Sequence, residues 1–148
     1  MITASETQAQ AMGLEALPLR VSAPDPDLDD VFASIRDKRA EALLVLEEPA
    51  VGVYANGIAE LASKDRLPTL FAPSRASAGG LISYGTSQVQ SIRRMAAYVG
   101  RILKGARPGD LPVERVAPYE LVVNLKTARR IGLEIPPEVI KRADRVIE

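Results

Sequence analysis

Short apolar runs without polar alternation constrain the fold of this chain more than any other feature of its sequence. The run 42–46, Ala-Leu-Leu-Val-Leu, contains no polar residue, which is typical of a strand buried on both faces of a parallel sheet. Segments with apolar residues at helical spacing lie between such runs, and the longest covers 87–104. Because strands alternate with helices, the sequence predicts the α/β class, with an open, mostly parallel sheet and helices on both faces.

Cap and turn residues predict where the other elements begin and end. We expect further strands at 16–21, 69–72, 81–84 and 119–123. We expect helices at 3–13, from 25 onward, at 50–65, up to 132 and at 137–146. Thr3 and Glu6 have the spacing of a capping box, and Asp25 before Pro26 is typical of a helix start. The proline-rich stretch 105–118 predicts an extended connection within a single lobe that spans 1–148.

Histidine and cysteine are both absent, which excludes most catalytic chemistry. Without them the chain cannot form a thiol nucleophile, a serine–histidine triad or the usual zinc, copper and haem sites. Nineteen basic residues balance nineteen acidic ones, so no net field attracts nucleic acid. We therefore expect a non-catalytic protein without metal, cofactor or nucleic-acid partner.

Three alternating aspartates, Asp25, Asp27 and Asp29, are spaced like the start of a calcium-binding loop. That loop requires glycine and glutamate where this chain has Asp30 and Arg36. We interpret the carboxylates as acids that complement the positive end of a helix dipole.

Polar side chains follow the predicted strands, at the edge where open α/β sheets bind ligands. Glu47 and Glu48 follow the first apolar run and can accept hydrogen bonds from an ammonium or hydroxyl group, although acids are also common at helix starts. Arg75 can bind a carboxylate or pair with these glutamates, unless it is simply solvated. Ser83 and Tyr84 can form a pocket wall, or Tyr84 can be a core ring with its hydroxyl at the surface.

Six segments follow one another in a characteristic order and spacing: 79–85, 98–105, 110–114, 119–128, 132–137 and 142–148. This order resembles the C-terminal half of the substrate-binding proteins of one bacterial ABC-transporter family, which includes tryptophan- and tyrosine-type binders. The resemblance covers nearly the whole chain and is densest from Ala78 onward.

The resemblance implies a type I periplasmic-binding-protein-like lobe that closes with a second lobe on a small molecule and then docks on a membrane permease. Six residues would fall on the cleft-facing strand ends and bind the ligand: Glu47, Glu48, Ser74, Arg75, Ser83 and Tyr84. The resemblance further implies that the protein recognises a solute, such as an amino acid, in the periplasm. No signal peptide is visible at the start of the sequence, so a cytoplasmic ligand-sensing or assembly module is the alternative.

Self-association is expected from the same resemblance. In such proteins a further strand precedes the first helix of this lobe, and the long helix returns to the N-terminal lobe. Neither the strand nor that lobe is in this sequence, so the apolar residues of 87–104 would be exposed. Because unpaired strand edges and exposed apolar faces favour association, we expect a homodimer.

Overall fold

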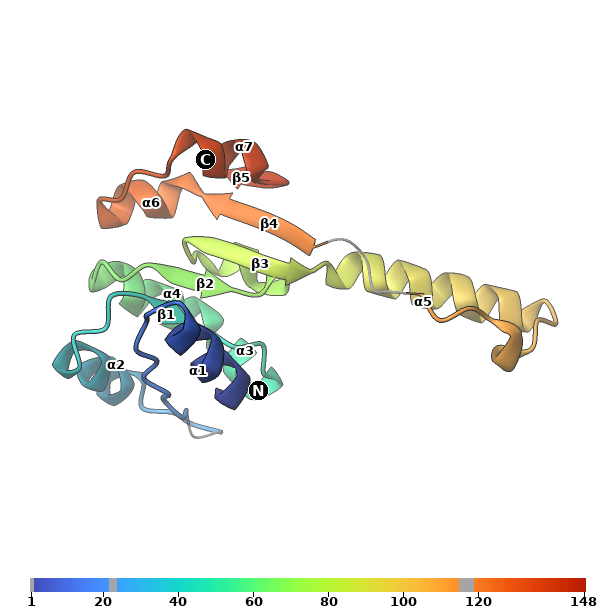
Figure 1. Cartoon of the computed structure of the whole chain (residues 1–148), viewed down its shortest axis with the longest axis horizontal. Helices are drawn as coiled ribbons and strands as arrows, with labels where there is room; N and C mark the ends of the chain where they lie inside the picture. The colour runs from blue at the N-terminus through green and yellow to red at the C-terminus, as the bar shows by residue number, and fades with distance from the viewer. Residues whose placement is uncertain (1, 22–23, 115–118) are drawn as a thin grey trace. The chain divides into compact units, whose positions relative to one another are not determined.

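The structure is a computed structural model that describes residues 2–21, 24–114 and 119–148 (Figure 1). Residue contacts divide the chain into two compact units, 1–41 and 42–148. The single lobe over 1–148 stays a prediction. Within the described residues, no helix has the length and apolar character needed to cross a membrane.

The first unit contains two helices, α1 (Ile2–Ala11) and α2 (Leu28–Asp37). The first residue of a capping box is the N-cap, which precedes the helix. Thr3 already lies within α1, so the predicted capping box is wrong. Residues 16–21 form no strand, and the strand predicted there is also wrong. The N-cap of α2 is Asp27, whose carboxylate accepts a hydrogen bond of 3.0 Å from the Asp30 amide; the helix therefore starts later than predicted from Asp25.

The second unit is built on a sheet of five strands in the order β1-β2-β3-β4-β5 (Figure 1). The strands are β1 (Leu43–Leu44), β2 (Thr69–Phe71), β3 (Ile82–Thr86), β4 (Tyr119–Asn124) and β5 (Arg145–Ile147). Neighbours pair in parallel except β3 and β4, which are antiparallel. The predicted α/β class with an open, mostly parallel sheet is confirmed.

Strand β1 differs from its prediction. It is only two residues long, and Leu44 is 52% exposed, so the strand is not buried on both faces. The reason is its position, because among the residues that the structure describes β1 is the last strand at one end of the sheet and pairs only with β2. Apolar composition alone cannot tell an end strand from a central one.

The helices of this unit are α3 (Pro49–Gly52), α4 (Ala55–Lys64), α5 (Gln88–Leu103), α6 (Leu125–Ile131) and α7 (Pro137–Arg142). Two short 3-10 helices, η1 (Pro73–Ala78) and η2 (Pro108–Asp110), lie in the connections. The predicted helix 50–65 is broken between α3 and α4, and the predicted helix 137–146 ends early because β5 follows it. Part of the predicted connection 105–118 lies outside the described residues.

The buried core of the second unit includes one face of α4, with Ala55, Ile58, Ala59 and Ala62. It also includes a cluster in which Leu81, at the start of β3, packs with two residues of α6, Ala128 and Ile131. Helix α4 also contacts η1 and α6. Polar groups inside this region are satisfied: the Thr69 hydroxyl oxygen accepts a bond of 2.9 Å from the Leu81 amide, and the Thr127 hydroxyl donates one of 2.7 Å to the Gly79 carbonyl. These bonds fix the start of β3 relative to β2 and α6.

Candidate functional site

The predicted site residues converge because β1, β2 and β3 run in parallel. Glu47 follows β1, and Ser74 is the second residue of η1, which follows β2. Tyr84 lies one position beyond Ser83, the β3 residue that pairs with the last residue of β2. The carboxyl ends of parallel strands meet at one edge of a sheet, so these side chains share that edge. Strand β4 is antiparallel to β3, and its first residue therefore reaches the same edge.

A direct side-chain contact joins the ends of β1 and β2. The Ser74 hydroxyl donates a hydrogen bond of 2.6 Å to Glu47 Oε1, across 27 positions of sequence. A bond to an ionised carboxylate is stronger than one between neutral groups. One carboxylate at this edge is therefore held in place by the next strand, while its remaining acceptor capacity is left for a ligand.

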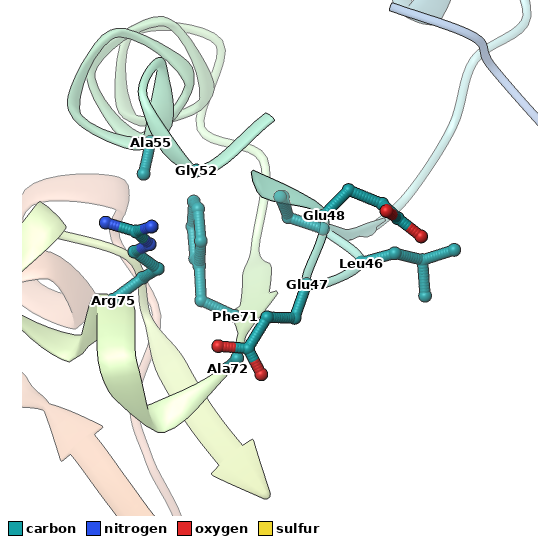
Figure 2. Close-up of a pocket in the computed structure, with 9 residues that line it drawn as sticks. Leu46, Glu47, Glu48, Gly52, Ala55, Phe71, Ala72 and Arg75 are labelled. Carbon is teal, nitrogen blue, oxygen red and sulfur yellow. The ribbon is translucent and has the colours of Figure 1, made fainter. Parts of the chain in front are cut away.

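Arg75 lies beside this pair, over α3. Its guanidinium is so close to Gly52 that a Cβ atom added there would overlap it. Figure 2 shows the guanidinium directed toward Gly52 and Ala55, and the Glu48 carboxylate directed away from it. Glu47 bonds to Ser74, and no ion pair joins Arg75 to a glutamate within the described chain. The exposed guanidinium is therefore available to an anionic ligand.

A small hollow lies among these residues (Figure 2). Its lining comes from three neighbouring segments: Val45, Leu46, Glu47, Glu48, Gly52, Ala55, Phe71, Ala72 and Arg75. The hollow measures about 10 Å³, which is the space of about one water molecule. A small-molecule site normally encloses several hundred Å³, so this hollow by itself is too small to enclose such a ligand.

Two tyrosines extend the edge along β3 and β4. The rings of Tyr84 and Tyr119 stack with their centroids 5.4 Å apart and an interplanar angle of 14°, and they are 52% and 63% exposed. Tyr84 is therefore not a core ring. A Cβ atom at Gly85 would lie only 3.1 Å from Pro73 Cδ, so η1 begins beside the face of β3 that is opposite to the tyrosine pair.

The remaining predicted residue, Ser83, has only 3% of its surface exposed and points to the opposite face of β3 from Tyr84. Its role as a ligand residue stays a prediction.

Sequence reasoning missed Tyr119, although a usable signal existed. Tyr119 starts a predicted strand that follows a long connection from the end of β3. If that strand paired antiparallel with β3, Tyr119 would lie beside Tyr84.

These features define an α/β lobe of the periplasmic-binding-protein-like class, with polar and aromatic residues along the carboxyl edge of its sheet. The sequence matches the family of ABC transporter substrate binding proteins over residues 2–147. The chain belongs to this family, as the resemblance indicated. No curated protein matches it.

Solved structures agree with this assignment. A conserved domain protein from Vibrio cholerae has a TM-score of 0.82 and 25% identity, and the match covers 98% of this chain and 49% of that one. An ABC domain from Streptococcus pneumonia, solved with L-Trp, has a TM-score of 0.78 and 23% identity over 99% of this chain and 49% of that one. A ligand-free, open substrate binding protein from Clostridium difficile has a TM-score of 0.67 and 16% identity, covering 99% and 48%. The chain therefore spans about half the length of these structures.

Proposed function

We propose that this chain recognises a small solute, such as an amino acid, as the C-terminal lobe of a substrate-binding protein for an ABC-type uptake transporter. The observation that carries the proposal is the Ser74–Glu47 hydrogen bond, which fixes a carboxylate beside the Arg75 guanidinium at the carboxyl edge of the sheet. Family membership supports transport over a cytoplasmic sensing or assembly module. The role is one of binding and involves no catalysis.

The two charged groups suit a ligand that carries both charges. The Glu47 carboxylate would accept hydrogen bonds from an ammonium group, and the Arg75 guanidinium would donate to a carboxylate, which an arginine can bind through two parallel bonds. The Glu48 carboxylate is directed away from the Arg75 guanidinium in Figure 2 and would contribute mainly negative potential. An α-amino acid presents these two groups on one carbon atom.

The tyrosine pair favours a ligand with a flat ring. Tyr84 and Tyr119 expose more than half of their surfaces although they stack on each other, so ring surface is still open for a third group. A further offset-stacked ring would contribute about 0.5–1.5 kcal/mol beyond its buried area. The L-Trp bound to the Streptococcus pneumonia domain has such a ring and supports an aromatic amino acid as the ligand class.

The small size of the hollow indicates that this lobe needs a second lobe to enclose a solute. A hollow of about 10 Å³ cannot enclose a solute, so a second wall is needed, and the affinity of this lobe alone should be weak. We propose that the loaded two-lobed protein delivers its solute to a membrane permease from the periplasmic side. A homodimer of the present chain is a separate proposal, which does not depend on solute binding.

Titration with L-tryptophan tests the proposed site directly. The chain contains four tyrosines but no tryptophan, so the ligand can be excited selectively at wavelengths beyond the tyrosine absorption band. We expect a saturable change in ligand emission that weakens several-fold in Ser74→Ala and in Tyr119→Leu, and less in Tyr119→Phe, which keeps the ring. The control is Ser77→Ala, because this exposed serine of η1 does not line the hollow. Equal titration curves for all four variants would place the site elsewhere.

A further inference from the structure

Gly85 of β3 lies against the start of η1, the short helix that carries two of the proposed ligand residues. A Cβ atom at Gly85 would lie 3.1 Å from Pro73 Cδ and 3.7 Å from Pro73 Cγ. Carbon atoms in ordinary contact are about 3.5–4.0 Å apart, so a side chain at this position would displace the proline ring. The backbone of Gly85 also has a φ of +154°, a conformation that L-residues rarely adopt. Position 85 therefore requires glycine.

The rest of η1 is held by contacts away from Pro73. Ala76, in the middle of the helix, is buried. Gly79 follows the helix in the left-handed conformation, and its carbonyl accepts a hydrogen bond of 2.7 Å from the Thr127 hydroxyl. Because closely packed segments transmit displacements, a shift of Pro73 must be absorbed in the first turn of η1, which contains Ser74.

This first turn makes the hydrogen bond on which the proposed site depends. Ser74 follows Pro73 directly, and its hydroxyl donates the bond of 2.6 Å to Glu47 Oε1. Hydrogen bonds between two oxygen atoms are about 2.5–3.0 Å long and weaken beyond that range. A Cβ atom at Gly85 would require Pro73 to give by a few tenths of an ångström. The two lengths are comparable, so filling the space beside Gly85 is enough to weaken the bond.

We propose that Gly85 is a positioning residue of the ligand site. Its missing side chain lets Pro73 approach β3, and this approach sets the Ser74 hydroxyl at hydrogen-bonding distance from Glu47. Gly85 acts through these residues and has no contact of its own with the ligand, because Pro73 fills the space beside it. The effect of Gly85 on solute affinity rests on the proposed function, whereas its effect on the Ser74–Glu47 distance does not.

Crystal structures of variants test the positioning without any ligand. We expect the distance from Ser74 Oγ to Glu47 Oε1 to increase from 2.6 Å by a few tenths of an ångström in Gly85→Ala, and further in Gly85→Val, whose side chain is larger. The matched control is Gly132→Ala, which also places alanine at a positive φ but where an added Cβ has no neighbour within 4 Å. The distance should not change in this control. An unchanged distance in both Gly85 variants overturns the proposal.

A reciprocal exchange of size separates the contact with Pro73 from backbone strain at Gly85. Pro73→Ala removes the two ring atoms that a Cβ atom at 85 would meet, so it leaves a gap where Gly85→Ala overfills the space. We expect each single variant to weaken the binding of L-tryptophan, and the double variant Pro73→Ala/Gly85→Ala to recover most of the affinity. Pro73→Ala keeps the native Gly85 and therefore still tests the contact if the Gly85 variants do not fold. Full affinity in Pro73→Ala would contradict the proposal.

Titration in a Ser74→Ala background shows whether Gly85 acts through Ser74. We expect Gly85→Ala to weaken the binding of L-tryptophan several-fold in the native chain and to cause no further loss once the Ser74 hydroxyl is absent. A loss that persists in full in the Ser74→Ala background overturns the proposal, because Gly85 would then act by another route. If Ser74→Ala itself binds L-tryptophan as tightly as the native chain, the proposed function fails, and the crystallographic distances still decide whether Gly85 positions Ser74.

Discussion

Gly52 controls the position of Arg75, because its missing side chain is what lets the guanidinium lie over α3. We expect Gly52→Ala to displace the guanidinium and to weaken the binding of a carboxylate ligand several-fold. Stability should change by no more than about 0.5 kcal/mol, since the overlapping atoms are the mobile end of an exposed side chain. Ligand titration and thermal unfolding measure the two effects. The control is Gly109→Ala, where an added Cβ has no neighbour within 4 Å.

Gly80 illustrates the opposite case, in which the neighbour cannot move. A Cβ atom there would overlap the ring of Phe71, which is only 2% exposed. We expect Gly80→Ala to destabilise the chain by about 1–3 kcal/mol, as over-packed cores do. Urea unfolding gives the value. A loss below about 0.5 kcal/mol would mean that the Phe71 ring has room to shift.

At the scale of elements, Tyr98 predicts the pH dependence of the contact between α5 and residues 106–114, here called the strap. The Tyr98 hydroxyl donates a hydrogen bond to the Pro112 carbonyl of the strap. Desolvation by the surrounding chain, together with the Glu114 carboxylate, raises the pKa of the Tyr98 hydroxyl above its ordinary value of 10.0. The hydroxyl is a donor only while protonated, so the strap contact is fully present below the ordinary pKa and is lost as the pH rises through the raised one. Phenolate absorbance should therefore show a late ionisation step, at a pH above the ordinary value of 10.0. This late step should vanish in Tyr98→Phe.

Elements with strong local signals could be predicted from the sequence. The long helix α5 follows from its apolar spacing, and α6 ends at Gly132, whose φ of +76° is a conformation that glycine favours. The sequence also placed β2, β3 and β4 within two residues of their ends. Helix α4 was predicted by its apolar face, but the separate turn of α3 was not.

Features that depend on tertiary position could not be predicted. Strand β5 is three residues long and pairs only with β4, so its local pattern continued that of the preceding helix. The exposure of Leu44 depends on β1 being at the end of the sheet. Within the candidate site, the sequence indicated Glu47 and Arg75, and the family resemblance added Ser74. Neither indicated that Glu47 would accept a hydrogen bond from Ser74 in place of an ion pair with Arg75, because that choice depends on the packing of η1 against β1 and α3.

At the scale of the whole molecule, the two units should differ in local stability. In the first unit the buried apolar side chains of α2 are Phe32 and Ile35, whereas the second unit holds the rest of the described buried core. Local opening is easiest where few apolar groups are buried. We expect amide hydrogens of α1 and α2 to exchange with solvent at least tenfold faster than those of β4. Uniform protection across both units in hydrogen-exchange mass spectrometry would show that the chain unfolds as one body.

The antiparallel pairing of β3 with β4 makes α5 and the strap a removable insertion. Thr86, where the chain leaves the sheet, is paired with Tyr119, where it returns. Partners in such a ladder lie about 5 Å apart, a gap that a two-residue Asn-Gly turn can span. A chain with that turn in place of 87–118 would join β3 and β4 as a simple hairpin and keep their register. The carboxyl edge of the sheet and α5 can therefore diverge independently, because exchanging one leaves the backbone of the other unchanged.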